Sequence, residues 1–580
     1  MTTPAVTRRE IAWVLAWAIL VMLLTCVPYY YATNLAHGRT FSGFLWGVDE
    51  GNVYLTWMRQ AAEGDLFFRN QYAVGPENPH FLNLFMQVGG RLSGLLNLRP
   101  IIIFHALRLL GGLFLLVSFY RLTAEITRDR IARWAALTLA SLGSGCGWLI
   151  VLKWPASSIH PVDVGQAWQV QPEALTFPSL LLNGLFTTSM ALMCLTFLYA
   201  LRALRDDDRK AVWWGGLCLL ILGNIHTYDV FPVWVALAAW GLSWRSPLPY
   251  RKRLAAIMAM ALPSVAWALY ATFSDPAFLA KGLTPTPAFR FVDYAVAYGL
   301  VGVLALLGAV LSAWSVREVT PPPASEATEE APEAPPLPTG PKGPSVALVP
   351  IAWATANALV LFIPVSFQRK MIEGLHLPLC ILAGVAVSWL ASLITTNLRR
   401  QGKHKHAMER LVLTVCALTV FCIPSNALFV SQCLQNAKTN NEALLTVLQP
   451  PLYLDAPVTK AMEWLGKNAT RDDIIVSSSL MGSYLPTYCP AKVWVGHWAE
   501  TLHFQDRLHD LDAIFGATDA ASLQAELRQR GITLVFHSPW EQALFAETSG
   551  QQWSQAAAKT LLKVYDQDGV RIYRVPQERR

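Results

Sequence analysis

Two adjacent carboxylates, Asp49 and Glu50, follow soon after the first long apolar run of the chain. A carboxylate at the edge of a membrane can act as a general base, taking a proton from a hydroxyl group as that hydroxyl attacks a substrate. A pair of carboxylates can instead hold a divalent metal ion that neutralises a phosphate leaving group. The third alternative is that both acids are solvated loop residues. The surroundings of the pair must decide among the three.

A second set of polar residues lies in the loop before the fourth apolar run. His160 and Asp163 place an imidazole and a carboxylate three positions apart, a spacing that suits metal or sugar binding and equally a plain turn. Glu173 stands just before the next apolar run, where an unpaired carboxylate is costly, so we expect it to bind substrate. The sequence demands no cofactor, and it permits a divalent metal ion on Asp49, His160 and Asp163.

His226 and Asp229 stand between the fifth and sixth apolar runs. Polar side chains at this depth must face a cavity or each other. A hydrogen bond between the two would satisfy both without any function. In the functional alternative, both residues bind substrate at the rim of an outward-facing cavity.

Arg369 and Lys370 are the best candidates for an anion site. With about eleven predicted spans, both residues fall on the outer side of the membrane. Basic residues normally gather on the cytoplasmic side, so a specific role must explain why these two lie outside. The fork of an Arg guanidinium matches a phosphate group, such as the headgroup of a polyprenyl phosphate. Snorkelling of both side chains to the membrane interface is the alternative. Arg290 is a weaker candidate of the same kind.

Composition places these residues in a membrane protein. Of the 580 residues, 53% are hydrophobic and only 15% are charged. The chain holds many apolar runs of about twenty residues, each long enough to cross about 30 Å of hydrocarbon. The formal net charge is +7, but Lys and Arg gather in short loops, which is typical of membrane topology rather than of nucleic-acid binding. We therefore expect a mainly helical polytopic membrane protein with no nucleic-acid partner.

The apolar runs predict about eleven spans, the first at about 11–31 and the last at about 410–430. With this count the basic clusters of alternate loops fall on the cytoplasmic side, together with the N-terminus. The first outer loop, residues 32–98, then holds the acidic pair. Two amphipathic helices at 50–63 and 79–98 should follow the pair and lie at the membrane interface.

Two further segments complete the predicted organisation. Residues 318–344 are rich in Pro, Ala and Glu, which predicts a disordered cytoplasmic linker within a membrane domain of residues 1–434. Residues 435–580 alternate short apolar runs with helical patterns and predict an extracytoplasmic α/β domain. Its strands should lie at 473–477, 492–495, 533–537, 561–564 and 570–575, and its helices at 457–467, 499–514 and 519–530. A disulfide between Cys433 and Cys489 is compatible with the sequence but does not follow from it.

This layout resembles the GT-C superfamily of polytopic glycosyltransferases, the class that contains protein O-mannosyltransferases and the aminoarabinose transferases of lipid A. The shared features are an acidic motif near the start of the first outer loop, two interfacial helices after it and an extracytoplasmic C-terminal domain. The run Tyr54-Leu55-Thr56-Trp57-Met58-Arg59-Gln60 is similar to uncharacterised bacterial members. The resemblance implies that the catalytic acid lies in Asp49-Glu50.

We therefore expect an inverting glycosyltransferase of the plasma membrane that takes a sugar from a polyprenyl-phosphate donor to an unknown acceptor on the extracytoplasmic side. Asp49 would be the general base and Glu50 the second catalytic carboxylate. The expected substrate-binding residues are Tyr54, Glu173, His226, Asp229, Arg290, Arg369 and Lys370.

Two other functions remain compatible with the sequence. A transporter or flippase of a lipid-linked saccharide would also carry polar residues within its spans. A non-catalytic assembly protein for an envelope polymer would use the C-terminal α/β domain to bind a partner.

Overall fold

The computed structural model describes residues 6–153, 171–243, 248–318, 345–400, 404–442 and 449–576. The chain divides into two compact units. The helical unit comprises Met1–Thr25, Arg108–Ala266 and Pro285–Val430, and the sheet unit comprises Cys26–Leu107, Trp267–Thr284 and Ser431–Arg580. His160, Asp163 and residues 319–344 of the predicted linker lie outside the described residues.

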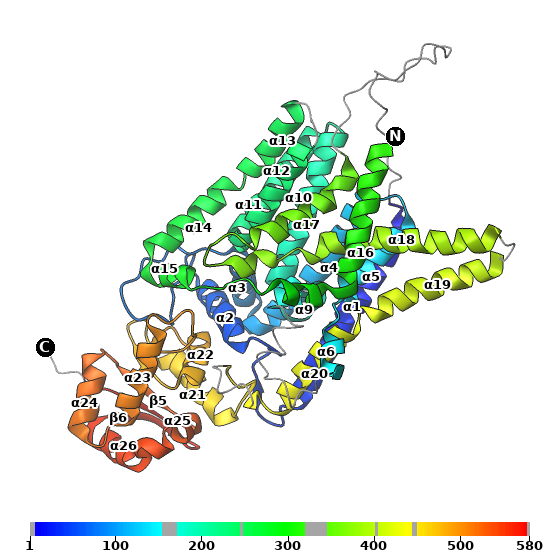
Figure 1. The fold of residues 1–580 in the computed structure, drawn as a ribbon. Helices are drawn as coiled ribbons and strands as arrows, with labels where there is room; N and C mark the ends of the chain where they lie inside the picture. The colour runs from blue at the N-terminus through cyan, green and yellow to red at the C-terminus, as the bar shows by residue number, and fades with distance from the viewer. Residues whose placement is uncertain are drawn as a thin grey trace, which may run out of the picture. The chain divides into compact units, whose positions relative to one another are not determined.

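Figure 1 labels the main helices and two strands of the sheet, β5 and β6, by the names used below. The helices of the first half are α1 (Arg8–Asn34), α2 (Val48–Glu63), α3 (Leu84–Leu96), α4 (Pro100–Ile126), α5 (Arg130–Leu142), α6 (Gly147–Lys153), α8 (Gln171–Ala174), α9 (Thr176–Leu182), α10 (Gly184–Arg205), α11 (Arg209–Ile225), the 3-10 helix η2 (Thr227–Asp229), α12 (Val230–Ser243), α13 (Leu248–Ala259), α14 (Leu262–Ser274) and α15 (Pro276–Leu283). Those of the second half are α16 (Phe291–Glu318), η4 (Val346–Leu348), α17 (Val349–Val360), η5 (Gln368–Ile372), α18 (His376–Arg400), α19 (His404–Phe421), α20 (Pro424–Lys438), α21 (Ala456–Asn468), α22 (Ser479–Tyr488), α23 (Phe504–Phe515), α24 (Ala520–Gln529), α25 (Pro539–Leu544) and α26 (Ala546–Thr560). The strands are β1 (Thr40–Phe41), β2 (Tyr453–Leu454), β3 (Ile474–Val476), β4 (Lys492–Val493), β5 (Leu534–His537), β6 (Leu562–Gln567) and β7 (Val570–Arg574).

The prediction of a mainly helical polytopic membrane protein is confirmed. Within the described residues, six helical stretches are long and apolar enough to span a membrane, and α19 with α20, bent by 40°, gives a seventh. The prediction of about eleven counted every apolar run. Several of those runs form shorter helices, such as α11 with 17 residues and α12 with 14. The third predicted span, at about 132–152, is broken between α5 and α6.

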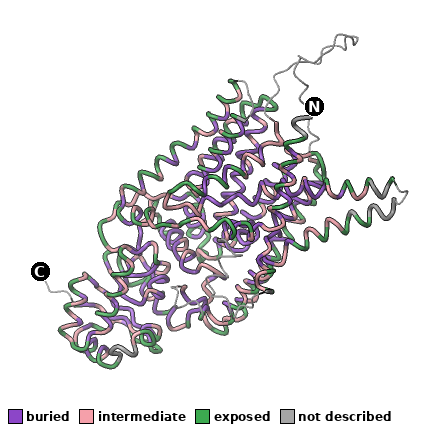
Figure 2. The backbone as a smooth tube through the Cα atoms, in the orientation of Figure 1, coloured by how far each residue is buried: buried purple, intermediate pink, exposed green. Residues whose placement is uncertain are grey.

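Close packing of long helices builds the helical unit. Helix α18 packs against α16, α5 and α19. At the contact between α16 and α18, a Cβ on Gly308 would lie 1.9 Å from the carbonyl oxygen of Leu382, so only glycine allows the two backbones to approach this closely. Figure 2 shows the buried backbone inside this unit, and 78% of the apolar window of α10 is buried.

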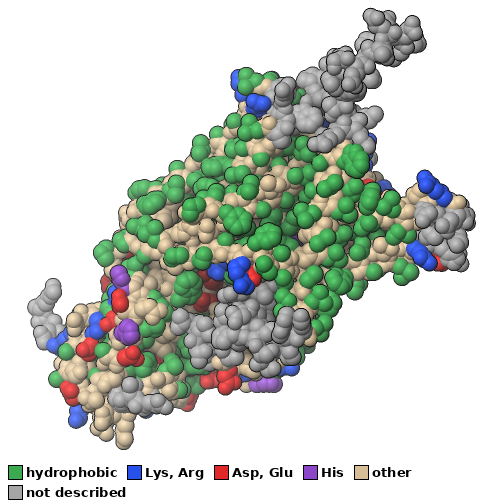
Figure 3. All heavy atoms as spheres, viewed as in Figure 1, with side chains coloured by type: hydrophobic (Ala, Val, Ile, Leu, Met, Phe, Trp, Pro, Cys, Tyr) green, Lys and Arg blue, Asp and Glu red, His purple; other side chains and the backbone are tan. Residues whose placement is uncertain are grey.

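The outward surface of the helices is apolar, as contact with lipid requires. In Figure 3, hydrophobic side chains cover the visible helical surface. Large exposed examples are Leu269 and Phe273 on α14 and Leu306 and Trp314 on α16. A soluble protein rarely exposes so many large apolar side chains on neighbouring turns.

The sheet unit is built on a five-stranded sheet with the order β4-β3-β5-β7-β6. Strand β3 pairs in parallel with β4 and β5, whereas β7 is antiparallel to β5 and β6. The alternating apolar pattern predicted all five strands close to their observed bounds. Helices α22, α25 and α26 were not predicted.

The first loop of the chain belongs to the same unit as the sheet. Strand β1 pairs with β2, with Thr40 opposite Leu454. Helix α2 packs against α3 and α22. The predicted helix at 50–63 corresponds to α2, and the one at 79–98 starts later, at Leu84, because the Asn83 side chain caps α3 by accepting from the Met86 amide. The separate domain predicted at 435–580 stays a prediction, since residues 26–107 and 267–284 cluster with it. Cys433 and Cys489 are both free and buried.

Candidate functional site

Asp49 lies in the first turn of α2, which begins after a left-handed turn. Gly47 precedes the helix with φ 61° and ψ 48°, a conformation that favours glycine. Asp49 and Glu50 then sit where the unpaired backbone amides and the helix dipole favour negative charge. The Asp49 side chain is only 7% exposed, whereas that of Glu50 is 45% exposed. The two acids therefore differ in their contact with solvent.

His497 faces this acidic pair within the sheet unit. Its Nε2 lies 3.7 Å from Asp49 Oδ2 and 3.7 Å from Glu50 Oε1. Its Nδ1 accepts hydrogen bonds from the backbone amides of Ala499, at 3.1 Å, and Glu500, at 3.2 Å. A nitrogen that accepts carries no proton, so in the neutral ring the proton is on Nε2 and is directed toward the carboxylates.

Asp49 combines burial with an unsatisfied oxygen. Within the described part of the chain, neither Asp49 Oδ1 nor His497 Nε2 has a hydrogen-bond partner, and 3.7 Å is too long for a direct bond between the two side chains. Burial raises the pKa of Asp49 above its usual value, His497 acts to lower it, and the nearby Glu50 acts to raise it. A carboxylate in this state is a better proton acceptor than a solvated one once it is ionised.

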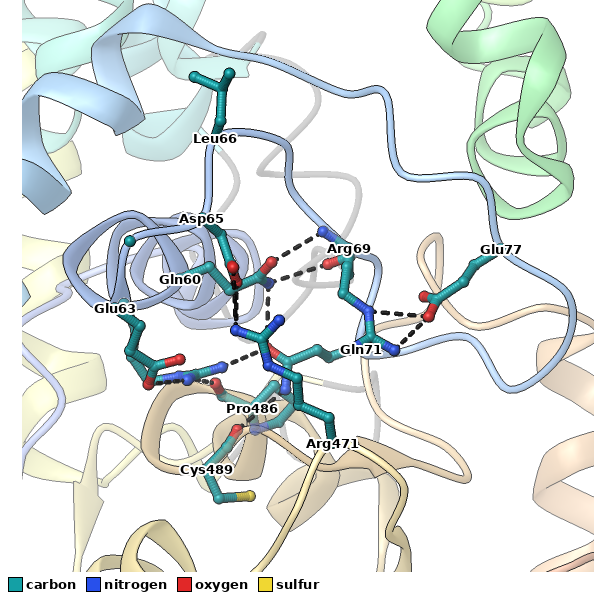
Figure 4. Close-up of polar contacts among 12 residues, drawn as sticks. Gln60, Glu63, Asp65, Leu66, Arg69, Gln71, Glu77, Arg471, Pro486 and Cys489 are labelled. Atoms are coloured by element: carbon teal, nitrogen blue, oxygen red, sulfur yellow. Dashed lines mark hydrogen bonds and ion pairs between the residues drawn. The ribbon is translucent and has the colours of Figure 1, made fainter.

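A polar network holds α2 in place against the C-terminal part of the sheet unit (Figure 4). Arg59 donates to the carbonyl of Pro486 at 3.0 Å. Gln71 donates to the carbonyls of Cys489, at 3.0 Å, and Ala491, at 2.9 Å. Arg471 adds an ion pair with Asp65 at 2.8 Å. These contacts fix the helix that carries Asp49 relative to the segment that carries His497.

The segment after His497 contributes a second buried charge. Glu500 is 2% exposed, accepts from Asn70 Nδ2 at 3.0 Å and forms an ion pair with Lys281. The Lys281 ammonium also lies over the ring of Trp57, 5.4 Å from its centroid. The paired charges anchor the turn whose amides donate to His497. Trp498, next to His497, is 38% exposed and stacks on its ring.

Two hollows adjoin this cluster in the sheet unit. One, of about 500 Å³, is lined by Asn52, one helical turn beyond Asp49, and by Arg99 and Tyr484. The other, of about 450 Å³, is lined by Trp498 and by residues of α15 and α23. Tyr54, predicted to bind substrate, lines neither hollow and instead stacks on Phe104 at 6.2 Å.

The helical unit contains a second cluster of acids and histidine. His226 Nδ1 lies 3.0 Å from Asp229 Oδ2 and 3.4 Å from Glu373 Oε2. Asp229 and Glu373 are fully buried, and the His226 side chain is 12% exposed. Among the described residues, both oxygens of each carboxylate lack a hydrogen bond of normal geometry. Burial raises the pKa of Asp229, and His226 acts to lower it.

Local backbone structure brings the three side chains together. Helix α11 ends at Ile225 and His226 follows as its cap. The Asp229 amide donates to the His226 carbonyl at 3.2 Å, so the short turn η2 places both side chains near one another. Glu373 follows η5, and Asn357 fixes this turn by donating to the carbonyls of Met371 and Glu373, each at 3.0 Å. Helix η5 packs against η2 and α8.

Three predicted substrate-binding residues surround this second cluster. Glu173 is buried in α8; burial raises its pKa, and Arg369, Lys370 and His226 act to lower it. The Arg369 guanidinium lies 5.2 Å from the ring centroid of Phe289, and the Lys370 ammonium lies 5.1 Å from that of Tyr228. Both cations thus lie close enough to Glu173 to lower its pKa, and each packs against an aromatic ring.

Arg290 follows Phe289, the residue on whose ring Arg369 rests. Its side chain is 84% exposed and forms an ion pair with Asp293 at 3.0 Å. The structure therefore brings together Glu173, His226, Asp229, Arg369 and Lys370, but leaves Arg290 on the surface.

Sequence reasoning left out two members of these clusters. Glu373 lies three residues after Lys370, and a carboxylate so close to an apolar run was the available signal. His497 lies in the run Gly496-His497-Trp498, where an aromatic ring and an imidazole stand together. In the structure His497 is buried and Trp498 is partly exposed.

Comparisons with known proteins bear on the fold. No protein-family model matches the sequence, and no curated protein is similar to it. Among solved structures, a mutant form of the arabinofuranosyltransferase AftD from Mycobacteria matches with a TM-score of 0.54 and 13% identity, over 100% of this chain and 42% of that one. The chain has the GT-C fold. The resemblance seen in the sequence motifs is thus confirmed for the fold.

Two further solved structures match over most of this chain. The apo oligosaccharyltransferase from Archaeoglobus fulgidus has a TM-score of 0.47 and 11% identity, over 97% of this chain and 74% of that one. ArnT from Cupriavidus metallidurans, bound to undecaprenyl phosphate, has a TM-score of 0.44 and 14% identity, over 96% of this chain and 98% of that one. Both are GT-C glycosyltransferases.

Proposed function

We propose that this protein is a membrane glycosyltransferase that moves a sugar from a polyprenyl-phosphate donor to an acceptor hydroxyl on the extracytoplasmic side. The observation that carries the proposal is the buried carboxylate of Asp49, with its unsatisfied oxygen and its histidine neighbour. The GT-C fold supports the reaction class, because glycosyltransferases share it.

In the proposed reaction, Asp49 removes the proton of the acceptor hydroxyl while that oxygen attacks the anomeric carbon. A new carbon–oxygen bond forms as the bond to the donor phosphate breaks, and the anomeric configuration inverts. The raised pKa of Asp49 increases its basicity toward the hydroxyl. His497, as a positioning residue, directs its Nε2–H toward the carboxylate and steadies the ionised form. Glu50, at the same distance from this nitrogen, is the second carboxylate of the site.

Arg369 and Lys370 stay the predicted phosphate-binding residues, since negative charge develops on the leaving phosphate in the transition state. Glu173 is proposed to bind the hydroxyl groups of the sugar. Tyr54 and Arg290 stay predicted substrate contacts without support from the site geometry. The proposed topology keeps the N-terminus cytoplasmic and residues 435–580 outside.

The test supplies the purified full chain, in lipid nanodiscs, with radiolabelled polyprenyl-phosphate sugars and a panel of candidate acceptors. We expect transfer by the unchanged protein and a loss of about 10²–10⁴-fold in Asp49→Asn, the usual contribution of a general base. Glu63→Gln is the matched control, because it removes a partly exposed acid at the far end of the same helix, whose ion pair with Arg59 is of the i,i+4 kind.

Three results of this assay would contradict the proposed reaction or the role of Asp49 in it. Full activity in Asp49→Asn would remove this residue from the mechanism. If no donor is consumed with any acceptor, the glycosyltransferase assignment fails. Movement of the labelled donor across proteoliposome membranes without transfer would instead indicate the flippase.

A further inference from the structure

We propose that His226, Asp229 and Glu373 form a binding site for one divalent metal ion, of the zinc or manganese class. The three side chains each offer one ligand atom, and these atoms lie within 4.8 Å of one another. They come from two segments of the helical unit, η2 with the residue before it and the turn after η5.

Burial without partners is the first argument. Asp229 and Glu373 are fully buried, and in the described chain none of their four oxygens makes a hydrogen bond of normal geometry, although His226 Nδ1 lies 3.0 Å from Asp229 Oδ2. Two carboxylates that approach each other inside a protein cannot both remain charged unless a cation compensates them. The imidazole of His226 supplies one positive charge at most, whereas a divalent ion would neutralise both acids.

The distances are the second argument. Two ligand atoms that each lie about 2.1 Å from a metal, at angles of about 90–110°, are themselves about 3.0–3.4 Å apart. The observed separations from His226 Nδ1 are 3.0 Å to Asp229 Oδ2 and 3.4 Å to Glu373 Oε2. Two of the three separations thus already match a coordination shell, and all three ligand atoms lie within 4.8 Å of one another.

The ligand types select the metal. One imidazole nitrogen with two carboxylate oxygens suits Zn²⁺ or Mn²⁺, whereas Ca²⁺ and Mg²⁺ prefer an all-oxygen shell. Three protein ligands leave at least one position for water or for an oxygen of another molecule, as in catalytic rather than structural zinc sites. The hydrogen bonds of Asn357 to the carbonyls of Met371 and Glu373 hold the Glu373 backbone in place for this role.

Neighbouring charges suggest what the open position would take. Arg369 and Lys370 lie just before Glu373 and act on nearby Glu173. A metal ion beside two cations would bind a phosphoryl oxygen, so the site would take the phosphate of the donor. This last step rests on the proposed function, whereas metal binding itself does not.

The test measures metal without turnover. The full chain is purified in detergent and metal-free buffer, and its metal content is determined by inductively coupled plasma mass spectrometry. We expect about one equivalent of zinc or manganese per chain. After chelator treatment, titration with MnCl₂ should restore one site; manganese is used because it favours oxygen and nitrogen ligands over the free cysteines.

Variants then locate the site. Asp229→Asn and Glu373→Gln keep the side-chain shape and should weaken manganese binding by more than about 10-fold. Glu10→Gln is the matched control: Glu10 is also a buried acid of the helical unit, but Tyr120 and Arg133 already bind its carboxylate. Gel filtration verifies that each variant is folded and monodisperse.

Three outcomes would overturn the proposal. They are a monodisperse unchanged protein with neither bound metal nor a titratable site, metal binding that survives both ligand variants, and equal loss of metal in Glu10→Gln. Because none of these readouts needs glycosyl transfer, failure of the metal site and failure of the proposed function remain distinguishable.

Discussion

Each unit of the molecule holds a histidine beside buried acid, but the two clusters differ in the number of buried charges. In the sheet unit, two carboxylates lie 3.7 Å from His497 Nε2, and of these Asp49 is buried and Glu50 is half exposed. The buried Glu500 in the next turn is already paired with Lys281. In the helical unit, Asp229 and Glu373 are both fully buried around the single nitrogen of His226.

This difference separates two kinds of chemistry. One buried carboxylate can exist in either protonation state, so burial turns it into a proton acceptor with a raised pKa. Two buried carboxylates at one imidazole need a cation before both can be charged. The same residue types thus favour proton transfer in one cluster and metal binding in the other.

The largest expected effect compares Asp49→Asn with Asp229→Asn. Asp49→Asn should lower kcat by about 10²–10⁴-fold and leave the metal content unchanged, because it removes a base but no ligand. Asp229→Asn should lose the metal. Parallel assays of glycosyl transfer and metal content check this. Loss of metal in Asp49→Asn would contradict the assignment of different roles to the two clusters.

A smaller effect is expected for His497→Ala, in the pH dependence of kcat/KM. His497 holds the pKa of Asp49 down, so its removal should raise that pKa and move the acidic limb of the profile to higher pH. His497→Gln, which can still offer an N–H, should restore part of the shift. A histidine with a merely structural role would lower the rate at every pH and leave the limb in place.

The smallest expected effect concerns thermal stability, and it has opposite signs in the two clusters. Because burial raises the pKa of Asp49, this group stabilises the fold below its unfolded pKa, and that stabilisation is lost as the pH rises through the folded pKa. At neutral pH, Asp49→Asn should therefore raise the Tm by a few degrees, about 2–4 °C per kcal/mol.

In the metal-loaded protein, Asp229→Asn should lower the Tm instead. A ligand present at 100 times its Kd contributes about 2.7 kcal/mol to the stability of the folded state, and the variant would forfeit that contribution. Differential scanning fluorimetry with and without chelator measures both signs. Equal shifts in the two variants would mean that the clusters do not differ as described.

Local patterns in the sequence predicted much of this fold. Alternation of apolar residues located β3 to β7, and helical spacing located α2 to within two residues. The spacing of apolar residues depends only on the local sequence, and the bounds of these elements agree with that spacing. The span count exceeded the observed number because an apolar run does not reveal a break such as that between α5 and α6.

The sites depended on contacts that no local pattern encodes. The sequence marked Asp49 and, separately, the Gly-His-Trp run, but only the folded sheet unit brings His497 to within 3.7 Å of that acid. Likewise, Asp229 and Glu373 were both visible as acids next to apolar runs. Their shared approach to His226 required the packing of η2 against η5.

The pairing of β1 with β2, and of Gln71 with the carbonyls of Cys489 and Ala491, has a consequence for biogenesis. Helix α2 emerges from the ribosome long before the segment that steadies it, so the acid and its histidine cannot meet until that later segment has been made and folded. A nascent or clipped chain that lacks this later segment would therefore hold Asp49 without its His497 neighbour. On the proposed function, such a chain would be inactive until the C-terminal part of the sheet unit has folded.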